Sequence, residues 1–337
     1  MEPSGKRPLR FGLSLPNRAV LFGMPAALLL ETAEQADASG AFDSVWVGDN
    51  FLSKPRLEAI VTLSALAART RTLKLGTICL ASFPLRHPLL LALQWASLDV
   101  LSGGRTILTV CNGGAARMGP AFAAELAASG VQSSERMARL EEGIELLRLL
   151  FGPDPVTYHG RFYTFDDVRL TPKPVQARVP ICIAVNPPAD VDPAVEERAL
   201  RRVARLADGW QTDAIAPDLF RSRWARIQEY ATEYGRAGQV TDAQLHLMVN
   251  INDDAKRAHA ESVEFLQRYY GEGTISEEFL DLWLAYGPPS RVIEKIGAYV
   301  EAGYTTPVLR FTSLRQREQL ERCIAEVLPA FQTSTAS

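Results

Sequence analysis

Apolar residues along the chain alternate between short continuous runs and longer stretches with helical spacing. Runs such as Pro180–Val185 are almost wholly apolar, which predicts strands buried on both faces. Stretches such as Ala26–Ala38 repeat apolar residues every three or four positions, which predicts helices. The eight strands expected are Leu9–Leu15, Asp43–Gly48, Leu73–Cys79, Arg105–Cys111, Pro180–Val185, a short strand around Trp210, Leu245–Ile251 and Thr306–Phe311.

A helix is expected after each of these strands. The order favours an α/β fold made of one (β/α)8 TIM barrel over an open doubly wound sheet, which more often has five or six strands. We expect the barrel domain to span residues 9–332, between an N-terminal tail (1–8) and a C-terminal tail (333–337). The helices expected are Ala26–Ala38, Leu57–Ala68, Leu89–Leu101, Glu135–Leu150, Ala194–Leu206, Pro217–Tyr234, Asp254–Tyr270, Ser290–Ala302 and Leu314–Phe331.

Three stretches are too long to be simple connections. Asn112–Ser133 follows the fourth strand as a Gly/Ala-rich loop, and Pro153–Pro174 reads as a small β excursion before the fifth strand. Gly271–Gly287 follows the helix after the seventh strand and carries aromatic and acidic residues. Loops this long in a compact domain are usually functional, and in a barrel the loops that follow strands form the active-site face. We expect the loop Gly271–Gly287 to cover the substrate.

Composition narrows the class of protein. Lys and Arg number 36 against 39 Asp and Glu, giving a formal charge of −3, and 47% of residues are hydrophobic. This composition excludes a disordered chain and argues against nucleic acid as a partner. The apolar run Ala26–Leu30 is far short of a membrane span, and no apolar segment follows the basic residues of the first ten positions. We expect a cytoplasmic protein with no membrane partner.

Metal and disulfide chemistry have little support in the sequence. The four cysteines (Cys79, Cys111, Cys182 and Cys323) are widely separated, and each lies in an apolar segment. The four histidines show no ligand spacing, so we expect neither a metal site nor a disulfide framework. No nucleophile elbow, P-loop or dinucleotide-binding glycine motif is present. A hydrolase or a kinase is therefore not indicated.

The residues that follow the predicted strands are mostly amides. Asn17, Asn50, Asn112 and Asn186 each follow a different strand, and Gln211 leads to Asp213 after the sixth. In a barrel these positions meet at one end. Amides above apolar strands suit a neutral heteroaromatic ring whose edge needs donors and acceptors. For any one of these residues, capping a strand or a turn is an equally good interpretation.

Several motifs together resemble the luciferase-like monooxygenase family. The similarity runs from Phe11 to about Phe311. Relatives in this family use reduced FMN and oxygen, or the deazaflavin coenzyme F420, which transfers hydride. The family fold is a (β/α)8 barrel. The motifs are Leu75–Thr77, Pro84–Pro88, Leu98–Arg105, Glu141–Leu147, Tyr158–Tyr163, Ala204–Trp210 and Gly287–Ser290.

The resemblance implies where a cofactor binds. In the family the ring packs against a bulge at the end of the third strand, commonly made by a non-prolyl cis peptide, which here is Ile78-Cys79. The second and fourth strands end beside the ring, at Asp49 and Asn50 and at Cys111, Asn112 and Gly113. The cofactor phosphate lies near the fifth and sixth strand ends, which implies backbone N–H groups around Ala184, Val185 and Asn186 and after Trp210.

Two departures from the family pattern affect the expected reaction. Many relatives have His where this chain has Asn50, and an acid after the glycines of the fourth strand, where this chain has Gly114-Ala115. Asn cannot act as a base, although its amide can donate to a developing anion. These departures favour a monooxygenase that uses reduced FMN and oxygen on a small organic substrate, with Asn50 as the catalytic residue. His87 is expected to cap the third helix rather than to act as a base.

Two other functions stay open at this stage. One is an F420-dependent oxidoreductase that moves hydride directly, and the other is a non-catalytic flavin-binding relative. For the preferred function we expect a separate flavin reductase as a partner, because the chain has no nicotinamide fingerprint. We also expect a homodimer.

Overall fold

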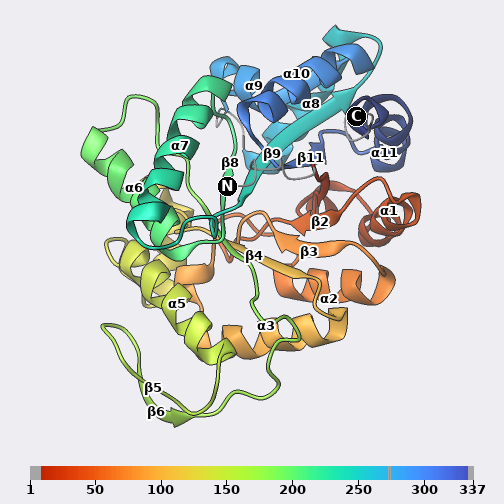
Figure 1. The fold of residues 1–337 in the computed structure, drawn as a ribbon. Helices are drawn as coiled ribbons and strands as arrows, with labels where there is room; N and C mark the ends of the chain where they lie inside the picture. The colour runs from red at the N-terminus through yellow and green to blue at the C-terminus, as the bar shows by residue number, and fades with distance from the viewer. Residues whose placement is uncertain (1–8, 272, 274, 333–337) are drawn as a thin grey trace, which may run out of the picture.

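A computed structural model describes residues 9–271, 273 and 275–332 and confirms the barrel. Eight parallel strands of this described part pair in the order β1-β2-β3-β4-β7-β8-β9-β11, and β11 pairs with β1 to close the ring (Figure 1). The predicted tails, 1–8 and 333–337, lie outside the described residues. The barrel strands are β1 (Gly12–Leu15), β2 (Ser44–Val47), β3 (Lys74–Thr77), β4 (Thr106–Val110), β7 (Ile181–Ala184), β8 (Gly209–Thr212), β9 (Asp242–Ile251) and β11 (Thr306–Phe311).

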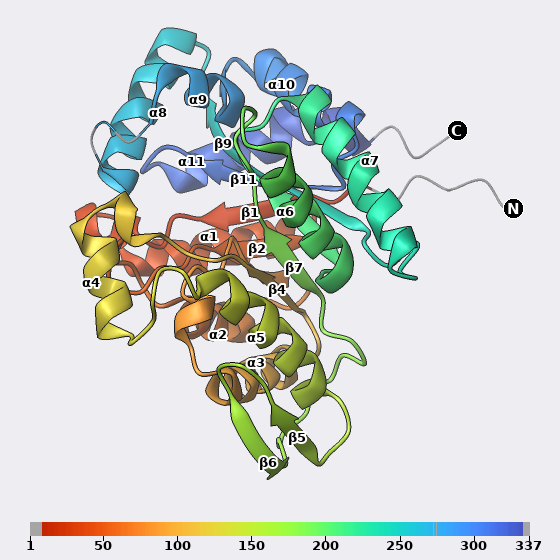
Figure 2. The same ribbon diagram turned by 90° about the vertical axis from the view of Figure 1, so that its left-hand side faces the viewer.

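Helices surround the barrel, and those predicted from helical spacing are present (Figures 1 and 2). Their apolar stripes pack on the outward faces of strands that read as nearly continuous hydrophobic runs. Within the described residues, no helix is both long and apolar enough to cross a membrane. These helices are α1 (Ala26–Ser39), α2 (Ala59–Arg69), α3 (Pro88–Ser102), α5 (Arg136–Phe151), α6 (Pro193–Leu206), α7 (Pro217–Glu233), α8 (Ala255–Tyr270), α10 (Pro289–Ala302), α11 (Gln316–Arg322), a π-helical turn (Cys323–Val327) and α12 (Pro329–Gln332).

The three long connections contain regular structure that the sequence only partly predicts. The β excursion is a hairpin of β5 (Val156–His159) and β6 (Thr164–Val168), which projects beyond α3 and α5 (Figure 2). The connection after β4 holds α4 (Pro120–Ala128), although it reads as a loop in the sequence. The connection after α8 holds α9 (Glu277–Trp283) and β10 (Leu284–Gly287), which pairs with the upper half of β9.

The lower barrel interior is filled by one large side chain and by glycines that make room for it. Trp46 on β2 is fully buried and donates from Nε1 to Ser44 Oγ over 2.8 Å. A Cβ on Gly76 would lie 2.2 Å from the Trp46 ring, and one on Gly12 would lie 2.4 Å from its Nε1. Neither position can hold a side chain while the indole stays in place. The barrel is thus a packed core at this level, and the chemistry must lie above it.

A polar layer lies above the Trp46 level. Gln244 Oε1 on β9 accepts from Thr109 Oγ1 on β4 at 3.0 Å and from Gln211 Nε2 on β8 at 2.8 Å. Thr77 Oγ1 on β3 donates to the Thr109 carbonyl oxygen over 2.7 Å. The layer joins four strands through buried groups whose hydrogen bonds are satisfied. These hydrogen bonds hold the side chains of the polar layer in place beneath the carboxyl ends of β3 and β4.

Candidate active site

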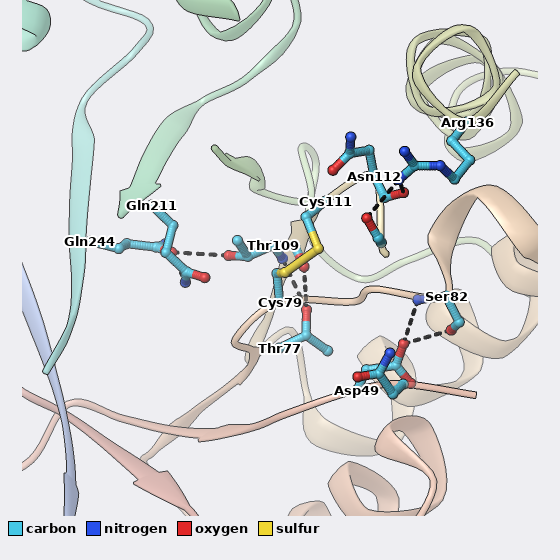
Figure 3. Close-up of a disulfide and its surroundings, with 12 residues drawn as sticks. Asp49, Thr77, Cys79, Ser82, Thr109, Cys111, Asn112, Arg136, Gln211 and Gln244 are labelled. Carbon is cyan, nitrogen blue, oxygen red and sulfur yellow. Dashed lines mark hydrogen bonds between the residues drawn. A yellow bond between two sulfur atoms is a disulfide. The ribbon is translucent and has the colours of Figure 1, made fainter. Parts of the chain in front are cut away.

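The ends of β3 and β4 lie side by side at the mouth of the barrel, where a disulfide joins them (Figure 3). The peptide bond between Ile78 and Cys79 is cis, at the position that the family resemblance indicates. Cys79 is joined to Cys111 by a disulfide, with the two Cα atoms 6.0 Å apart. The expectation of no disulfide was therefore wrong for this pair, because a sequence separation of 32 hid the fact that the two strands are neighbours. Cys182 and Cys323 are free and buried, as expected.

The loop after β4 lies tightly against the loop after β3. Gly113 has φ of +62°, and a Cβ at this position would lie 2.4 Å from the Ala81 carbonyl oxygen. Arg136 of α5 donates from Nη1 to the carbonyl oxygens of Asn112 (2.9 Å) and Gly113 (2.7 Å). Cys111, Asn112 and Gly113 are thus held at a fixed height beside Ile78 and Cys79. Five of the predicted cofactor residues therefore lie together.

Asp49 contributes to this surface through its neighbours. Its side chain is buried, and Oδ2 accepts from Ser82 N at 2.7 Å and Ser82 Oγ at 2.6 Å (Figure 3). Arg86 Nη2 lies 3.3 Å from the other oxygen, Oδ1. These bonds tie the end of β2 to the loop after β3, so Asp49 positions the bulge that carries Cys79. Cofactor binding by Asp49 stays a prediction.

Asn50 is held at the start of the loop after β2. Its Nδ2 donates to Ser53 Oγ over 3.1 Å, and its Oδ1 lies 3.5 Å from Arg56 Nη2. Glu125 of α4 closes over the same loop, and its Oε2 accepts from the backbone N–H groups of Leu52 (2.5 Å) and Ser53 (2.7 Å). Glu125 could not be found from the sequence pattern, because α4 itself was not predicted. The catalytic role of Asn50 stays a prediction.

The ends of β7 and β8 continue the mouth of the barrel beside β4, with which β7 pairs. Trp210 is buried, stacks on Phe220 at 5.2 Å and donates from Nε1 to the Val185 carbonyl oxygen over 2.7 Å. Asn186 donates from Nδ2 to Asp213 Oδ1 over 3.1 Å. Ala184, Val185, Asn186 and Trp210 therefore lie together, and their contact with a cofactor phosphate stays a prediction.

Asp213 is a titratable group of the site that the residue predictions left out. Withdrawal of its carboxyl from water raises its pKa, against the lowering effect of the Asn186 hydrogen bond. Among the described residues, no Lys, Arg or His nitrogen lies within 4.0 Å of this carboxylate. A carboxyl with a raised pKa at the mouth of a barrel is a candidate proton acceptor.

The histidines do not supply a base at this surface. His87 is the residue before α3, but its side chain packs edge-on against Tyr163 at 5.6 Å and forms no capping hydrogen bond. His246 on β9 is buried, and its Nε2 has no partner in the described part of the chain. Burial and the charge of Arg310 lower the pKa of His246 well below its ordinary value. His246 is therefore neutral at physiological pH.

The family model described as luciferase-like monooxygenase matches residues 9–306 of this sequence. The chain belongs to the luciferase-like monooxygenase family. Two solved structures show the same fold over 96% of this chain. An F420-dependent secondary alcohol dehydrogenase, in complex with an F420–acetone adduct, has a TM-score of 0.79 at 20% identity and is covered over 99% of its length. The monooxygenase RslO1 from Streptomyces bottropensis has a TM-score of 0.78 at 21% identity and is covered completely.

Sequence relatives of this luciferase-like protein bear on the cofactor. An F420-dependent glucose-6-phosphate dehydrogenase from Amycolatopsis mediterranei is 28% identical over 330 residues, covering 89% of this chain and 93% of the relative. A protein of the same name from Kineococcus radiotolerans is 26% identical over 330 residues, covering 89% and 92%. The luciferase-like chain described here is accordingly an oxidoreductase.

These relatives overturn the expectation of an FMN-dependent monooxygenase. That expectation rested on the absence of a His at Asn50 and of an acid at Gly114, and it treated those two positions as the sources of acid–base chemistry. The fold brings another carboxyl, Asp213, to the same end of the barrel from a strand more than 160 positions later in the chain. A missing motif residue is weak evidence when a (β/α)8 barrel offers eight strand ends.

Proposed function

We propose that this luciferase-like protein is an F420-dependent oxidoreductase that transfers hydride between the deazaflavin and a small organic alcohol or carbonyl compound. The observation that carries the proposal is the similarity, along about nine-tenths of both chains, to proteins named F420-dependent glucose-6-phosphate dehydrogenase. F420 is a two-electron carrier, so the cofactor supplies the hydride chemistry when it is bound. The residues of this chain then have to bind the ring, orient the substrate and accept or donate one proton.

The surface at the ends of β3 and β4 fits a flat neutral ring. Ile78, Cys79, Cys111, Asn112 and Gly113 offer backbone groups, a disulfide and an amide. The nearby guanidinium of Arg136 is already bonded to carbonyl oxygens. We assign these five residues to the ring. For the cofactor phosphate we assign Ala184, Val185, Asn186 and Trp210, on the neighbouring strands β7 and β8.

We assign the proton transfer to Asp213. Oxidation of an alcohol releases a hydride to the cofactor and a proton to a base, and reduction of a carbonyl needs the reverse. Asp213 Oδ1 is bonded to Asn186, which leaves Oδ2 to accept or return the proton. Asn50 would donate its amide to the substrate oxygen at the opposite side. The proposal therefore gives the proton transfer to Asp213 and a neutral hydrogen bond to Asn50.

Binding and turnover test the proposal. Purified protein titrated with F420 and, separately, with FMN should show micromolar binding of F420 alone. A panel of alcohols should then bleach the visible absorbance of the bound deazaflavin. Binding of FMN without F420 would refute the proposal, and F420 binding without turnover of any alcohol or carbonyl compound would favour a non-catalytic relative.

A matched pair of glycine variants locates the ring. Gly113 and Gly130 both have positive φ, but only a Cβ on Gly113 would meet another group, the Ala81 carbonyl oxygen. Gly113→Ala should weaken F420 binding by about tenfold or more, because it pushes apart the two loops that flank the ring. Gly130→Ala carries similar backbone strain and should leave the affinity unchanged. Equal affinities for both variants would move the ring away from Gly113.

The proposed reaction also bears on partners. A protein that reduces F420 with its own substrate needs no separate flavin reductase, so that partner is not part of this proposal. We do propose a homodimer. α3 exposes Leu90, Leu93 and Leu101, and α2 exposes Val61; Leu101 is 73% exposed. Light scattering should give twice the mass of one chain, and Leu90→Asp with Leu101→Asp should halve it. A wild-type monomer would contradict the dimer.

A further inference from the structure

Four cationic side chains gather at the mouth of the barrel where β1, β2 and β11 end. We call Arg18, Lys54, Arg56 and Arg310 the cationic cluster. Arg310 on β11 is 1% exposed, whereas the other three are half-buried. The Arg310 guanidinium donates to Ser14 Oγ from Nε (3.0 Å) and Nη2 (2.7 Å), and to the Tyr270 hydroxyl from Nη1 (3.2 Å). All of its hydrogen-bond partners are neutral.

The guanidinium groups of Arg56 and Arg310 lie close to each other. A Cβ on Gly48 would be 2.5 Å from Arg56 Nη1 and 3.6 Å from Arg310 Nη2, so both guanidinium groups border the same point. Both also lie near the ring of Tyr269: Arg56 Cζ is 5.7 Å and Arg310 Cζ is 5.0 Å from the ring centroid.

The rest of the cluster is bound to the same short loop. Arg18 Nη1 donates to the Pro55 carbonyl oxygen over 3.0 Å, and Arg56 Nε donates to the Lys54 carbonyl oxygen over 3.2 Å. Lys54 Nζ lies 5.2 Å from the Tyr270 ring centroid. The four residues therefore form one patch with aromatic walls.

The cluster has no counter-charge in the part of the chain that is described. No carboxylate oxygen of residues 9–271, 273 or 275–332 lies within 4.0 Å of its charged nitrogens. By contrast, Arg223 is as buried as Arg310 and lies 2.6 Å from Glu196 Oε1. Burial and the charges of Arg56 and Arg18 lower the pKa of Lys54, and burial and Arg56 lower that of Arg18. Gathering unpaired cations in this way is costly unless an anion completes the site.

We propose that the cationic cluster binds an anionic group of the substrate, a carboxylate or a phosphate ester, and so selects an anionic alcohol or carbonyl compound. This inference rests on the proposed hydride transfer at the same mouth. The cluster surrounds the loop that begins at Asn50, and Arg56 Nη2 lies 3.5 Å from Asn50 Oδ1. The strand ends assigned to the cofactor phosphate are different ones, because β9 lies between β8 and β11, and β3 and β4 lie between β2 and β7.

The residues of the cluster have different tasks. Arg310 is fixed by Ser14 and Tyr270, so it supplies a permanent positive charge. Arg56 bonds only to neutral oxygens, at 3.2 and 3.5 Å, and its guanidinium can turn toward a carboxylate or phosphate and bind it through two N–H groups. Lys54 can approach as a point charge beside the Tyr270 ring. An anion held there places the rest of the substrate near Asn50 and Tyr270.

The test compares anions with a neutral molecule in calorimetric titrations, with and without F420. The probes are inorganic phosphate, benzoate and uncharged benzyl alcohol. Wild-type protein should bind one of the anions at least about tenfold more tightly than benzyl alcohol. Arg56→Gln should lose most of that difference without a change in melting temperature, because Arg56 has no ion pair to lose. Phosphate alone or benzoate alone would identify the anionic group.

Arg221→Gln is the matched control, because it removes the same charge from an exposed arginine that pairs with Asp218 on α7. It should bind the anions as the wild type does. Equal binding of anions and benzyl alcohol by the wild type, or unchanged anion binding by Arg56→Gln, would overturn the inference. If Arg56→Gln binds F420 about tenfold more weakly than the wild type does, the cluster belongs to the cofactor site, and this result would also overturn the inference. Anion binding without any F420 binding would instead refute the proposed function alone.

Discussion

Asn186 donates a hydrogen bond from Nδ2 to Asp213 Oδ1 over 3.1 Å, and this bond joins the carboxyl ends of β7 and β8. The remaining carboxylate oxygen is available to the mouth of the barrel. The charge of Asp213 also contributes to raising the pKa values of Tyr270 and Tyr304, which burial raises first. The charge of Asp213 therefore acts on two buried tyrosine hydroxyls.

Asp213 predicts a pH dependence for alcohol oxidation. Only the ionised carboxylate can accept the proton, so turnover should fall as pH drops through the raised pKa of Asp213. Asp213→Asn should lower turnover by roughly 10²–10⁴-fold and remove that acidic limb, while F420 affinity changes little. Steady-state rates across the acidic to neutral range measure both effects. Asp218→Asn, an exposed carboxyl on α7, is the control and should behave as the wild type does.

The same carboxyl predicts an opposite effect on stability. Because folding raises the pKa of Asp213, the folded chain binds more protons between the unfolded and folded pKa values, and the free energy of unfolding falls as pH rises through that interval. At neutral pH, Asp213→Asn should therefore keep or raise the melting temperature while turnover falls. A lowered melting temperature together with unchanged turnover would make Asp213 a structural residue.

The disulfide predicts a measurable contribution to stability. Cys79 and Cys111 close a loop across a sequence separation of 32, and such a cross-link usually contributes about 2–4 kcal/mol. Cys79→Ser with Cys111→Ser should lower the free energy of unfolding by that amount. Alkylation of the denatured chain should label two thiols before reduction and four afterwards. Four labelled thiols without reduction would contradict the cross-link.

Hydrophobic periodicity was enough to predict the barrel. Nearly continuous apolar strands and amphipathic helices are local properties, so β11 was predicted at its observed bounds and the other strands to within a few residues. α4 and α9 were missed because they lie in segments that read as long loops, with glycines, prolines or acidic residues around them. Propensity in such segments is a weak prior that tertiary packing overrides.

The site could be predicted only where strand ends define it. The cis peptide Ile78-Cys79 at the end of β3 is present, as the family resemblance implied. The Cys79–Cys111 bond, the Glu125 contact with the loop after Asn50, and the cationic cluster all join residues far apart in the chain. No spacing rule in a single sequence reports such contacts. The expected monooxygenase function was wrong because the absence of a His at Asn50 and of an acid at Gly114 was taken as decisive.

Because the lower barrel interior is tightly packed, adding a single methyl group there should reduce the free energy of unfolding. Gly76→Ala would place a Cβ 2.2 Å from the Trp46 ring and should reduce the free energy of unfolding by about 1–3 kcal/mol. Gly297 in α10 is the control, because a Cβ there meets nothing within 4 Å. Gly297→Ala should stabilise the protein by about 0.5–1 kcal/mol. Urea denaturation of both variants decides whether Trp46 fills the interior as described.

Asn50→Ala distinguishes a catalytic amide from a loop support. If Asn50 donates to the substrate oxygen, its removal should lower turnover by roughly 10²-fold, on the scale of a lost oxyanion-hole donor, and leave the melting temperature nearly unchanged. F420 affinity should fall less, because the ring rests mainly on the ends of β3 and β4. Asn50 also bonds to Ser53, so a purely structural role predicts a lowered melting temperature with turnover preserved at saturating substrate. Ser53→Ala serves as the control, because it removes the partner of the Asn50 amide and leaves the amide itself in place. If Ser53→Ala lowers turnover as much as Asn50→Ala does, the loop and not the amide is what the reaction requires.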